Sequence, residues 1–252
     1  MQHLAFADTG VKVSRMCIGA MSFGERTDGA EAARIVDAAL AAGVNFFDTA
    51  SLYTAGKSEQ VLSACLKGRR DQIFLATKVN VPTGPEYPPQ IGPSLDASLA
   101  RLGTDYVDLY LLHWPRVGMD AVAIMSELAK VVKAGKARFV GCCNFPAWLL
   151  AHFNAAAASI GGPRLINNQI PYNLIERGPE IEVLPQADAE KIAITCYRPL
   201  MAGALTDRYT AGEPPPADSR AVRDQRLPRW QEEHAKGIAH LKALAKGHGV
   251  PS

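Results

Sequence analysis

The chain has 252 residues, of which 48% are hydrophobic and 21% are charged, and these values suit one large α/β domain or two small ones with a real core. Its formal net charge of +2 is too small to indicate binding to nucleic acid or to an anionic membrane. No membrane span or signal peptide is recognisable, and the five cysteines form no C-x-x-C pair, so we expect a cytoplasmic protein with reduced thiols.

Short apolar strands recur along the chain at a period of about 30 residues, which indicates repeated strand–helix units. These strands are expected to begin near Val13, Val44, Ile73, Val107, Ala137, Leu165 and Ile192. At the start of the chain, residues 3–13 are predicted to form a small hairpin whose turn is Asp8-Thr9-Gly10. Strands such as residues 107–112 are continuous apolar runs, as expected for a sheet that is covered on both faces.

The segments between the strands carry start and stop signals for helices. The predicted helices begin at Asp28, Ser58, Pro93, Asp120, Pro146 and Pro179, and the first five end at Gly43, Gly68, Gly103, Gly135 and Gly161. Residues 205–228 break the rhythm and are predicted to form a long loop over the mouth of the fold, with a plain flexible excursion as the alternative. A last helix is expected from Pro228 or Arg229 to about Lys246.

Polar side chains follow strand after strand, in the order Asp48, Lys78, His113, Asn144, Gln169 and Tyr197. Polar groups gathered at the carboxyl ends of many strands are typical of the active face of a (β/α)8 barrel. The dinucleotide fingerprint G-x-G-x-x-G and the phosphate-binding P-loop motif, which would favour an open doubly wound sheet, do not occur. We therefore predict an α/β fold, a (β/α)8 TIM barrel, with residues 1–252 as a single domain.

Three of these polar residues, Asp48, Lys78 and His113, form a set with Tyr53 whose residue types indicate a chemistry. A tyrosine is a poor acid at neutral pH, and a nearby ammonium such as that of Lys78 favours the phenolate of Tyr53. Asp48 would keep Lys78 charged in a partly buried site, and His113 could orient a carbonyl oxygen by a hydrogen bond. The set contains no nucleophile or electron source, so hydride from a nicotinamide is the natural candidate.

The chain resembles the aldo-keto reductase family in seven segments, which occur in family order and cover roughly residues 3–212. The matching segments are GAMSFG at 19–24, FDTA at 47–50 with Tyr53, ATKV at 76–79, DYVDLYLLHW at 105–114, KARFVGCCNF at 136–145, NQIPYN at 168–173 and YRPL at 197–200. One such segment would be weak evidence, but seven in order are very specific. The resemblance implies an NAD(P)H-dependent reduction of aldehydes or ketones to alcohols.

The resemblance also implies a role for each matching residue. Tyr53 is expected to donate the proton, Lys78 to lower the pKa of Tyr53, Asp48 to pair with Lys78 and His113 to position the substrate carbonyl. Cofactor contacts are expected from Gly19, Met21, Asp48, Cys143, Asn144, Gln169, Tyr197, Arg198, Pro199, Leu200 and Ala202, with NADP(H) preferred and NAD(H) as the alternative. Phe23 and Trp114 are expected to wall the substrate pocket beside Tyr53 and His113.

Three positions depart from the family pattern: Cys143 and Arg198 stand where serine is common, and Thr54 where glycine often follows the tyrosine. None of them removes the four catalytic candidates. The alternative function is a cofactor-binding barrel that serves as a regulatory or redox-sensing subunit with little turnover. No metal is expected, because no H-E-x-x-H or Cys/His ligand spacing occurs.

The expected partner is a small to medium aldehyde or ketone with an apolar or aromatic side, because Phe23 and Trp114 supply flat apolar surface. Neither nucleic acid nor a membrane is expected to bind, and the protein should be a monomer or a small homo-oligomer. Seven strands are predicted where a barrel has eight, and Val250-Pro251-Ser252 resembles the start of another helix. We therefore expect a longer protein whose eighth strand and C-terminal segment follow residue 252.

Overall fold

The computed structural model describes residues 1–81, 90–209, 214–217, 219, 222 and 226–251. The chain forms two compact units, one of Met1–Gln169 with Glu182–Thr195 and one of Ile170–Ile181 with Cys196–Ser252. The candidate catalytic residues all belong to the first unit. None of the helices in the described part of the chain is long and apolar enough to cross a membrane.

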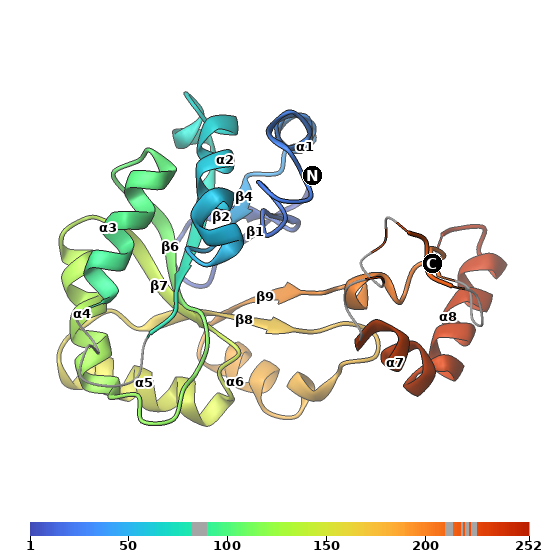
Figure 1. The fold of residues 1–252 in the computed structure, drawn as a ribbon. Coiled ribbons are helices and arrows are strands. Elements are labelled where there is room, and N and C mark those ends of the chain that lie inside the picture. Colours follow the sequence, from blue (N-terminus) through green and yellow to red (C-terminus); the bar gives the residue numbers. More distant parts are fainter. Residues whose placement is uncertain (82–89, 210–213, 218, 220–221, 223–225, 252) are drawn as a thin grey trace. The chain divides into compact units, whose positions relative to one another are not determined.

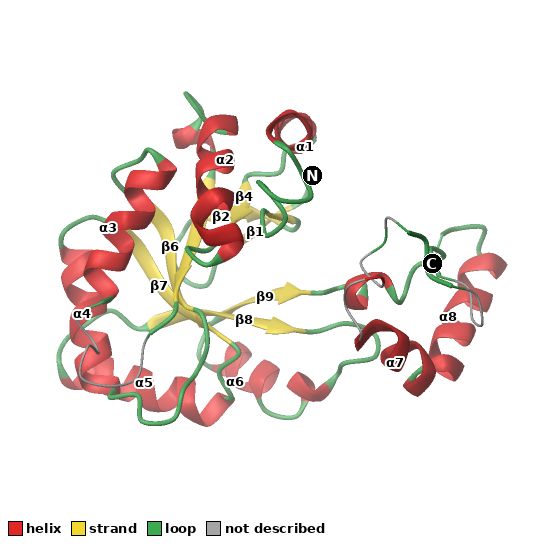
Figure 2. Cartoon of the chain, viewed as in Figure 1, coloured by secondary structure: helices red, strands yellow, loops and turns green. Residues whose placement is uncertain are grey.

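The centre of the fold is a seven-stranded sheet with the sequential order β3-β4-β5-β6-β7-β8-β9. Its strands are β3 (Cys17–Gly19), β4 (Phe46–Asp48), β5 (Phe74–Val79), β6 (Val107–Leu112), β7 (Ala137–Cys143), β8 (Leu165–Pro171) and β9 (Ala193–Tyr197). Neighbouring strands from β3 to β8 pair in parallel, with a register shift between β7 and β8. The predicted α/β class, with its alternating strands and helices, is confirmed (Figures 1 and 2).

Helices follow the strands along the first unit, and helices α2 to α5 lie outside the sheet (Figure 1). Their bounds are α1 (Gly29–Ala41), α2 (Lys57–Cys65), α3 (Ile91–Leu102), α4 (Ala121–Lys133), α5 (Ala147–Ser159) and α6 (Val183–Ala189). The predicted caps at Asp28 and Asp120 are confirmed, because each carboxylate accepts a hydrogen bond from the backbone N–H three residues later. Gly103 ends α3 in the left-handed conformation, with φ of 62°, as a C-terminal glycine should.

The two faces of the sheet bury different sets of side chains, as the alternation of a strand requires. Phe47, Leu75 and Leu112 join the large core beneath the helices. Phe46, Phe74, Leu109 and Leu111 form a second core on the inner face. The amino end of this inner core is closed by the hairpin of β1 (His3–Ala5) and β2 (Lys12–Ser14), whose Phe6 packs against Phe46 and Phe74.

Several predicted element starts differ from the structure, and for two of them hydrogen bonds give the reason. Val13 belongs to the hairpin strand β2, and the first strand of the parallel sheet begins four residues later at Cys17. Contacts with Asn45 hold this arrangement, since the backbone N–H of Ser14 donates to Asn45 Oδ1 and that of Asn45 donates to Ser14 Oγ. Ser58 does not precede a helix but lies buried inside α2, where it donates to the carbonyl of Ala20.

The second unit has its own small core, made by Met201, Ala204, Leu205 and Ile238. The predicted last helix is two helices, α7 (Arg226–Glu233) and α8 (Ala235–Gly247), which are separated at His234. Much of the long loop predicted at residues 205–228 lies outside the described residues, as do residues 82–89 before α3.

Candidate active site

The catalytic candidates share the inner face of the sheet because of strand alternation. Asp48 follows Phe46 by two residues and Lys78 follows Phe74 by four, so both point where those inner-core rings point. His113 comes directly after β6, two residues beyond Leu111. In the parallel register, Asp48 pairs with Ala76 and Lys78 pairs with Leu111, which brings the ends of β4, β5 and β6 together.

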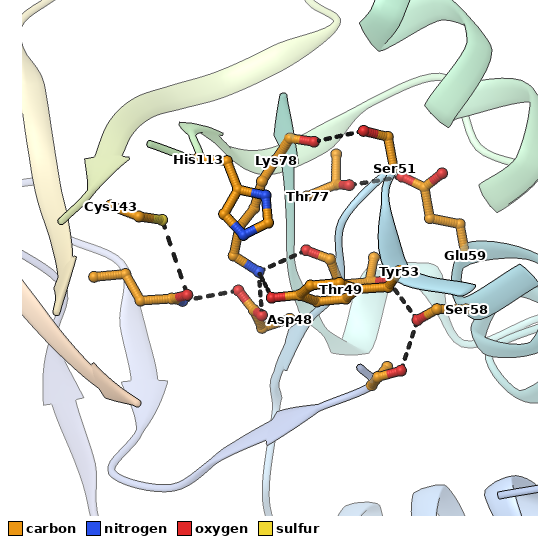
Figure 3. A network of polar contacts seen from close by, with 12 residues as sticks. Asp48, Thr49, Ser51, Tyr53, Ser58, Glu59, Thr77, Lys78, His113 and Cys143 are labelled. Atoms are coloured by element: carbon orange, nitrogen blue, oxygen red, sulfur yellow. Dashed lines mark hydrogen bonds and ion pairs between the residues drawn. The ribbon is translucent and has the colours of Figure 1, made fainter. Parts of the chain in front are cut away.

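Lys78 is the centre of the site (Figure 3). Its side chain is fully buried, and its Nζ donates to Asp48 Oδ2 at 2.5 Å, to the carbonyl of Thr49 at 2.8 Å and to Tyr53 Oη at 3.2 Å. Each of the three ammonium protons therefore has an oxygen acceptor, as a buried charge requires. The structure thus brings Asp48, Tyr53 and Lys78 together, as the sequence predicts.

Tyr53 lies at the start of a tight turn with an unusual backbone conformation. It opens a short 3-10 turn, Tyr53–Gly56, in which Thr54 and Ala55 have φ of 49° and 54° and Gly56 has φ of 88°. Three left-handed residues in a row turn the chain sharply and deliver the phenol to the lysine. The ring of Tyr53 also meets that of His113 edge to face, with centroids 5.7 Å apart.

The protonation states of this cluster follow from burial and charge. Burial opposes the charged form of Lys78, but the charge of Asp48 and the other neighbours outweigh it and raise the pKa of the ammonium. Burial also raises the pKa of Tyr53 above its ordinary value of 10.0, although Lys78 acts to lower it. Lys78 thus acts on the pKa of Tyr53 in the expected direction, but the effect of desolvation is larger.

His113 is held neutral at physiological pH. Burial and, secondarily, the Lys78 charge lower its pKa from 6.5 to about 4. Its backbone N–H donates to the carbonyl of Val79 at 2.8 Å, and its own carbonyl accepts from Asn144 Nδ2 at 3.3 Å. Among the described residues, its buried Nδ1 atom has no hydrogen-bond partner. The exposed ring of Trp114 stacks beside it, with centroids 6.2 Å apart.

Gln169 has a role that sequence reasoning missed. The sequence predicts it only as a cofactor contact, but its Nε2 donates to Asp48 Oδ1 at 2.9 Å. Both oxygens of that carboxylate therefore accept a hydrogen bond, one from Gln169 and the other from Lys78. The Sγ atom of Cys143 lies 3.9 Å from Gln169 Oε1, and burial raises the pKa of this thiol. The left-handed Asn144, with φ of 63°, donates its backbone N–H to the Gln169 carbonyl. These three residues are thus gathered at the ends of β7 and β8.

Glu59 is a second residue that the sequence did not single out. Its carboxylate is fully buried in α2, where it accepts from Thr77 Oγ1 and from Arg101 Nε, both at 2.6 Å. Thr77 precedes Lys78 on β5 and faces the helices, so its hydrogen bond to Glu59 ties β5 to α2 (Figure 3). The bond from Arg101 to Glu59 adds α3 to this network. A glutamate near the start of a helix normally faces solvent, and no local pattern signals this network.

The remaining expected contacts fall into two places. Met21 and Leu52 line a cavity of about 490 Å³ together with Tyr53, whereas Phe23, expected in the pocket wall, is buried in the hydrophobic core. Gly19 ends β3, and a Cβ at this position would meet nothing within 4 Å. Among the residues that the structure describes, no group of three or more His, Cys, Asp or Glu could hold a metal ion.

The other cofactor candidates belong to the second unit and are described within it. Tyr197 ends β9, and Arg198 follows it in the left-handed conformation, with φ of 55°. The Arg198 guanidinium lies 5.5 Å from the ring centroid of Tyr197 and 5.4 Å from that of Trp230, and its carbonyl accepts from Asn173 Nδ2. Pro199 and Leu200 lead into a 3-10 turn, Met201–Gly203, that contains Ala202.

The sequence profile of the Aldo/keto reductase family matches residues 15–252. Aldo-keto reductase YhdN of Bacillus subtilis is 34% identical over 264 residues, which cover 98% of this chain and 76% of that protein. Protein tas of Escherichia coli is 30% identical, over 99% of this chain and 83% of its own length. Aldo-keto reductase yakc of Schizosaccharomyces pombe, whose name specifies NADP(+), is 34% identical over 76% of this chain and 58% of its own length. The chain therefore belongs to the aldo/keto reductase family of oxidoreductases, whose fold is the (β/α)8 barrel.

Proposed function

We propose that this protein is an NAD(P)H-dependent reductase that converts aldehydes or ketones to alcohols, with Tyr53 as the general acid. The observation that carries the proposal is the hydrogen-bonded cluster of Asp48, Lys78 and Tyr53 on the inner face of the sheet. Such a cluster can deliver a proton to a developing alkoxide, but it has no electrons to give. The missing reducing equivalent is consistent with membership of an oxidoreductase family.

The residues at the strand ends fit a nicotinamide. The open space beside Gly19 would let a flat ring approach the backbone, and Gln169 Oε1 is a suitable acceptor for a carboxamide N–H. Asn144, Cys143 and Met21 are the other proposed holders in the first unit. From the second unit we propose Tyr197 as the ring-stacking group, with Arg198, Pro199, Leu200 and Ala202 near the phosphates. NADP(H) is the proposed form, and the name of the yakc relative supports it.

When bound, the reduced cofactor supplies a hydride to the carbonyl carbon. Tyr53 supplies the proton to the carbonyl oxygen, and its raised pKa keeps the phenol protonated at neutral pH. Lys78 stabilises the phenolate that remains, because its ammonium lies 3.2 Å from Tyr53 Oη. Asp48, oriented by Gln169, keeps that ammonium in place.

His113 positions the carbonyl oxygen as a neutral donor. With a pKa near 4, its ring carries one N–H at neutral pH. We assign this proton to Nε2, because a proton on the buried Nδ1 would have no acceptor among the described residues. A neutral donor orients the carbonyl without competing with Tyr53 as the acid. Trp114, stacked beside His113, is the proposed wall of the substrate site.

Loss of reduced-nicotinamide absorbance with a panel of aldehydes tests the proposal. We expect turnover of at least one aldehyde with NADPH, and weaker turnover with NADH. Cofactor binding without reduction of any carbonyl would instead support the alternative of a regulatory or redox-sensing barrel. No cofactor binding at all would contradict both functions.

A further inference from the structure

The cavity beside Tyr53 has a distinct chemical character. It has a volume of about 490 Å³, and the proposed acid forms part of its wall. Met21 and Leu52 give it apolar surface, and both side chains are exposed. Its lining also carries three charged side chains, namely Glu25, Arg26 and Lys57. Charged side chains in the lining of a substrate site select substrates by charge as well as by shape.

The two chain segments that carry these charges are fastened together. Arg26 lies in the loop after β3, and Lys57 begins α2 directly after the Tyr53 turn. Thr54 Oγ1 donates to the carbonyl of Phe23 at 3.1 Å, and Ser58 Oγ donates to that of Ala20 at 2.6 Å. A Cβ at Gly24 would lie 2.9 Å from Lys57 Cβ, so this glycine permits the close approach. The segments that carry Arg26 and Lys57 are therefore held in contact, and both side chains line the same cavity.

The charge balance of the lining favours an anion. Two cations and one carboxylate give a formal charge of +1 at neutral pH. Within the part of the chain that the structure describes, neither Arg26 nor Lys57 forms an ion pair, so their donors are available to a ligand. An arginine fork binds a carboxylate through two parallel hydrogen bonds, and a lysine adds a point charge.

We propose that the preferred substrates are carbonyl compounds that carry a carboxylate, which Arg26 and Lys57 bind while Tyr53 protonates the carbonyl oxygen. The proposal rests on the proposed reductase function and adds the substrate class. The apolar surface of Met21 and Leu52 suits the hydrocarbon body between the two polar ends. The proposal keeps the apolar or aromatic body that the sequence predicts for the substrate and adds a carboxylate to it.

The test compares 4-carboxybenzaldehyde with methyl 4-formylbenzoate, in which the same ring carries a neutral ester. We expect kcat/KM to be about tenfold higher for the acid, mainly through KM, because one charge-assisted contact is worth about this factor. Arg26→Gln and Lys57→Gln should each lower the acid-to-ester ratio several-fold, and Glu25→Gln should raise it. Lys67→Gln removes an exposed lysine beyond the end of α2 and serves as the control that leaves the ratio unchanged.

Equal kcat/KM values for acid and ester, with no response to Arg26→Gln, would overturn this inference while leaving the reductase function standing. Turnover of neither aldehyde would count against the reductase function instead. In that case binding decides, measured by calorimetry with the unreactive 4-carbamoylbenzoate and the neutral terephthalamide. Preferential binding of the anion that Arg26→Gln abolishes would support the anion site, and equal or absent binding would overturn it.

Discussion

Replacing Lys78 by methionine removes a buried ammonium and little else. The apolar stem keeps a similar length, but three oxygens lose their donor: Asp48 Oδ2, the Thr49 carbonyl and Tyr53 Oη. Asp48 retains the hydrogen bond from Gln169, so it is left half satisfied in a site where it is 7% exposed. Because a buried charge without its partner is costly, the main effect should be on the free energy of unfolding.

Removing one partner from a buried ion pair costs about 3–5 kcal/mol, and we expect the lower end because Gln169 remains. The chain offers a matched control in Lys136, whose Nζ lies at the same 2.5 Å from a carboxylate, that of Asp96. Those two side chains are 40% and 53% exposed. Lys136→Met should therefore cost about 1 kcal/mol or less.

Urea unfolding followed by circular dichroism gives both values. The raised pKa of Lys78 means that its contribution is fully present below the ordinary lysine pKa of 10.5 and is lost as the pH rises through the raised value. The difference between wild type and Lys78→Met should thus stay constant from about pH 6 to about pH 9. The double variant Asp48→Asn/Lys78→Met should recover part of the loss. A loss no larger than that of Lys136→Met would refute the buried pair.

Three further outcomes are expected. The pKa of His113 is lowered to about 4, so between pH 6.5 and pH 4 the unfolded chain binds more protons than the folded chain. The free energy of unfolding of the wild type should therefore fall from pH 6.5 towards pH 4. His113→Gln should make this fall less steep in urea titrations. Glu59→Gln leaves the Arg101 guanidinium without a carboxylate and should lower the free energy of unfolding by about 3 kcal/mol or more, whereas an unchanged urea midpoint would show that the network is dispensable. Gly141→Ala places a Cβ 2.8 Å from the Asn167 carbonyl and from Leu111 Cδ2 and should destabilise by about 1–3 kcal/mol, which a neutral result in the same assay would contradict.

The parts of the fold that local rules govern could be predicted from the sequence. Asp28 and Asp120 cap helices because a carboxylate at that position satisfies a backbone N–H a few residues away, and this needs no tertiary structure. The first strand of the sheet could not be placed in this way. Val13 and Cys17 both lie in short apolar runs. The pairing of Val13 with Leu4 assigns Val13 to the hairpin, and hydrogen bonds between Ser14 and Asn45, 31 residues apart, support this arrangement.

In the candidate site, too, some features follow from local rules and others depend on tertiary contacts. The strand ends that carry Asp48, Lys78 and His113 were predictable, because parallel strands bring their carboxyl ends to one edge. The bond from Gln169 to Asp48 joins residues 121 positions apart, and no motif in the sequence encodes it. The raised pKa of Tyr53 was missed for a related reason, since desolvation depends on what packs around the ring and not on the neighbouring lysine alone.

The role of Tyr53 as the acid is the central claim, and single-turnover hydride transfer from NADPH to an aldehyde tests it most directly. Tyr53→Phe removes one oxygen, which accepts a hydrogen bond from Lys78, while the ring can keep its contact with His113. We predict that the rate of hydride transfer falls by about a hundred- to ten-thousand-fold, the usual contribution of a general acid. The dissociation constant for NADPH should stay close to that of the wild type. A near wild-type rate in a folded Tyr53→Phe variant would contradict the assignment.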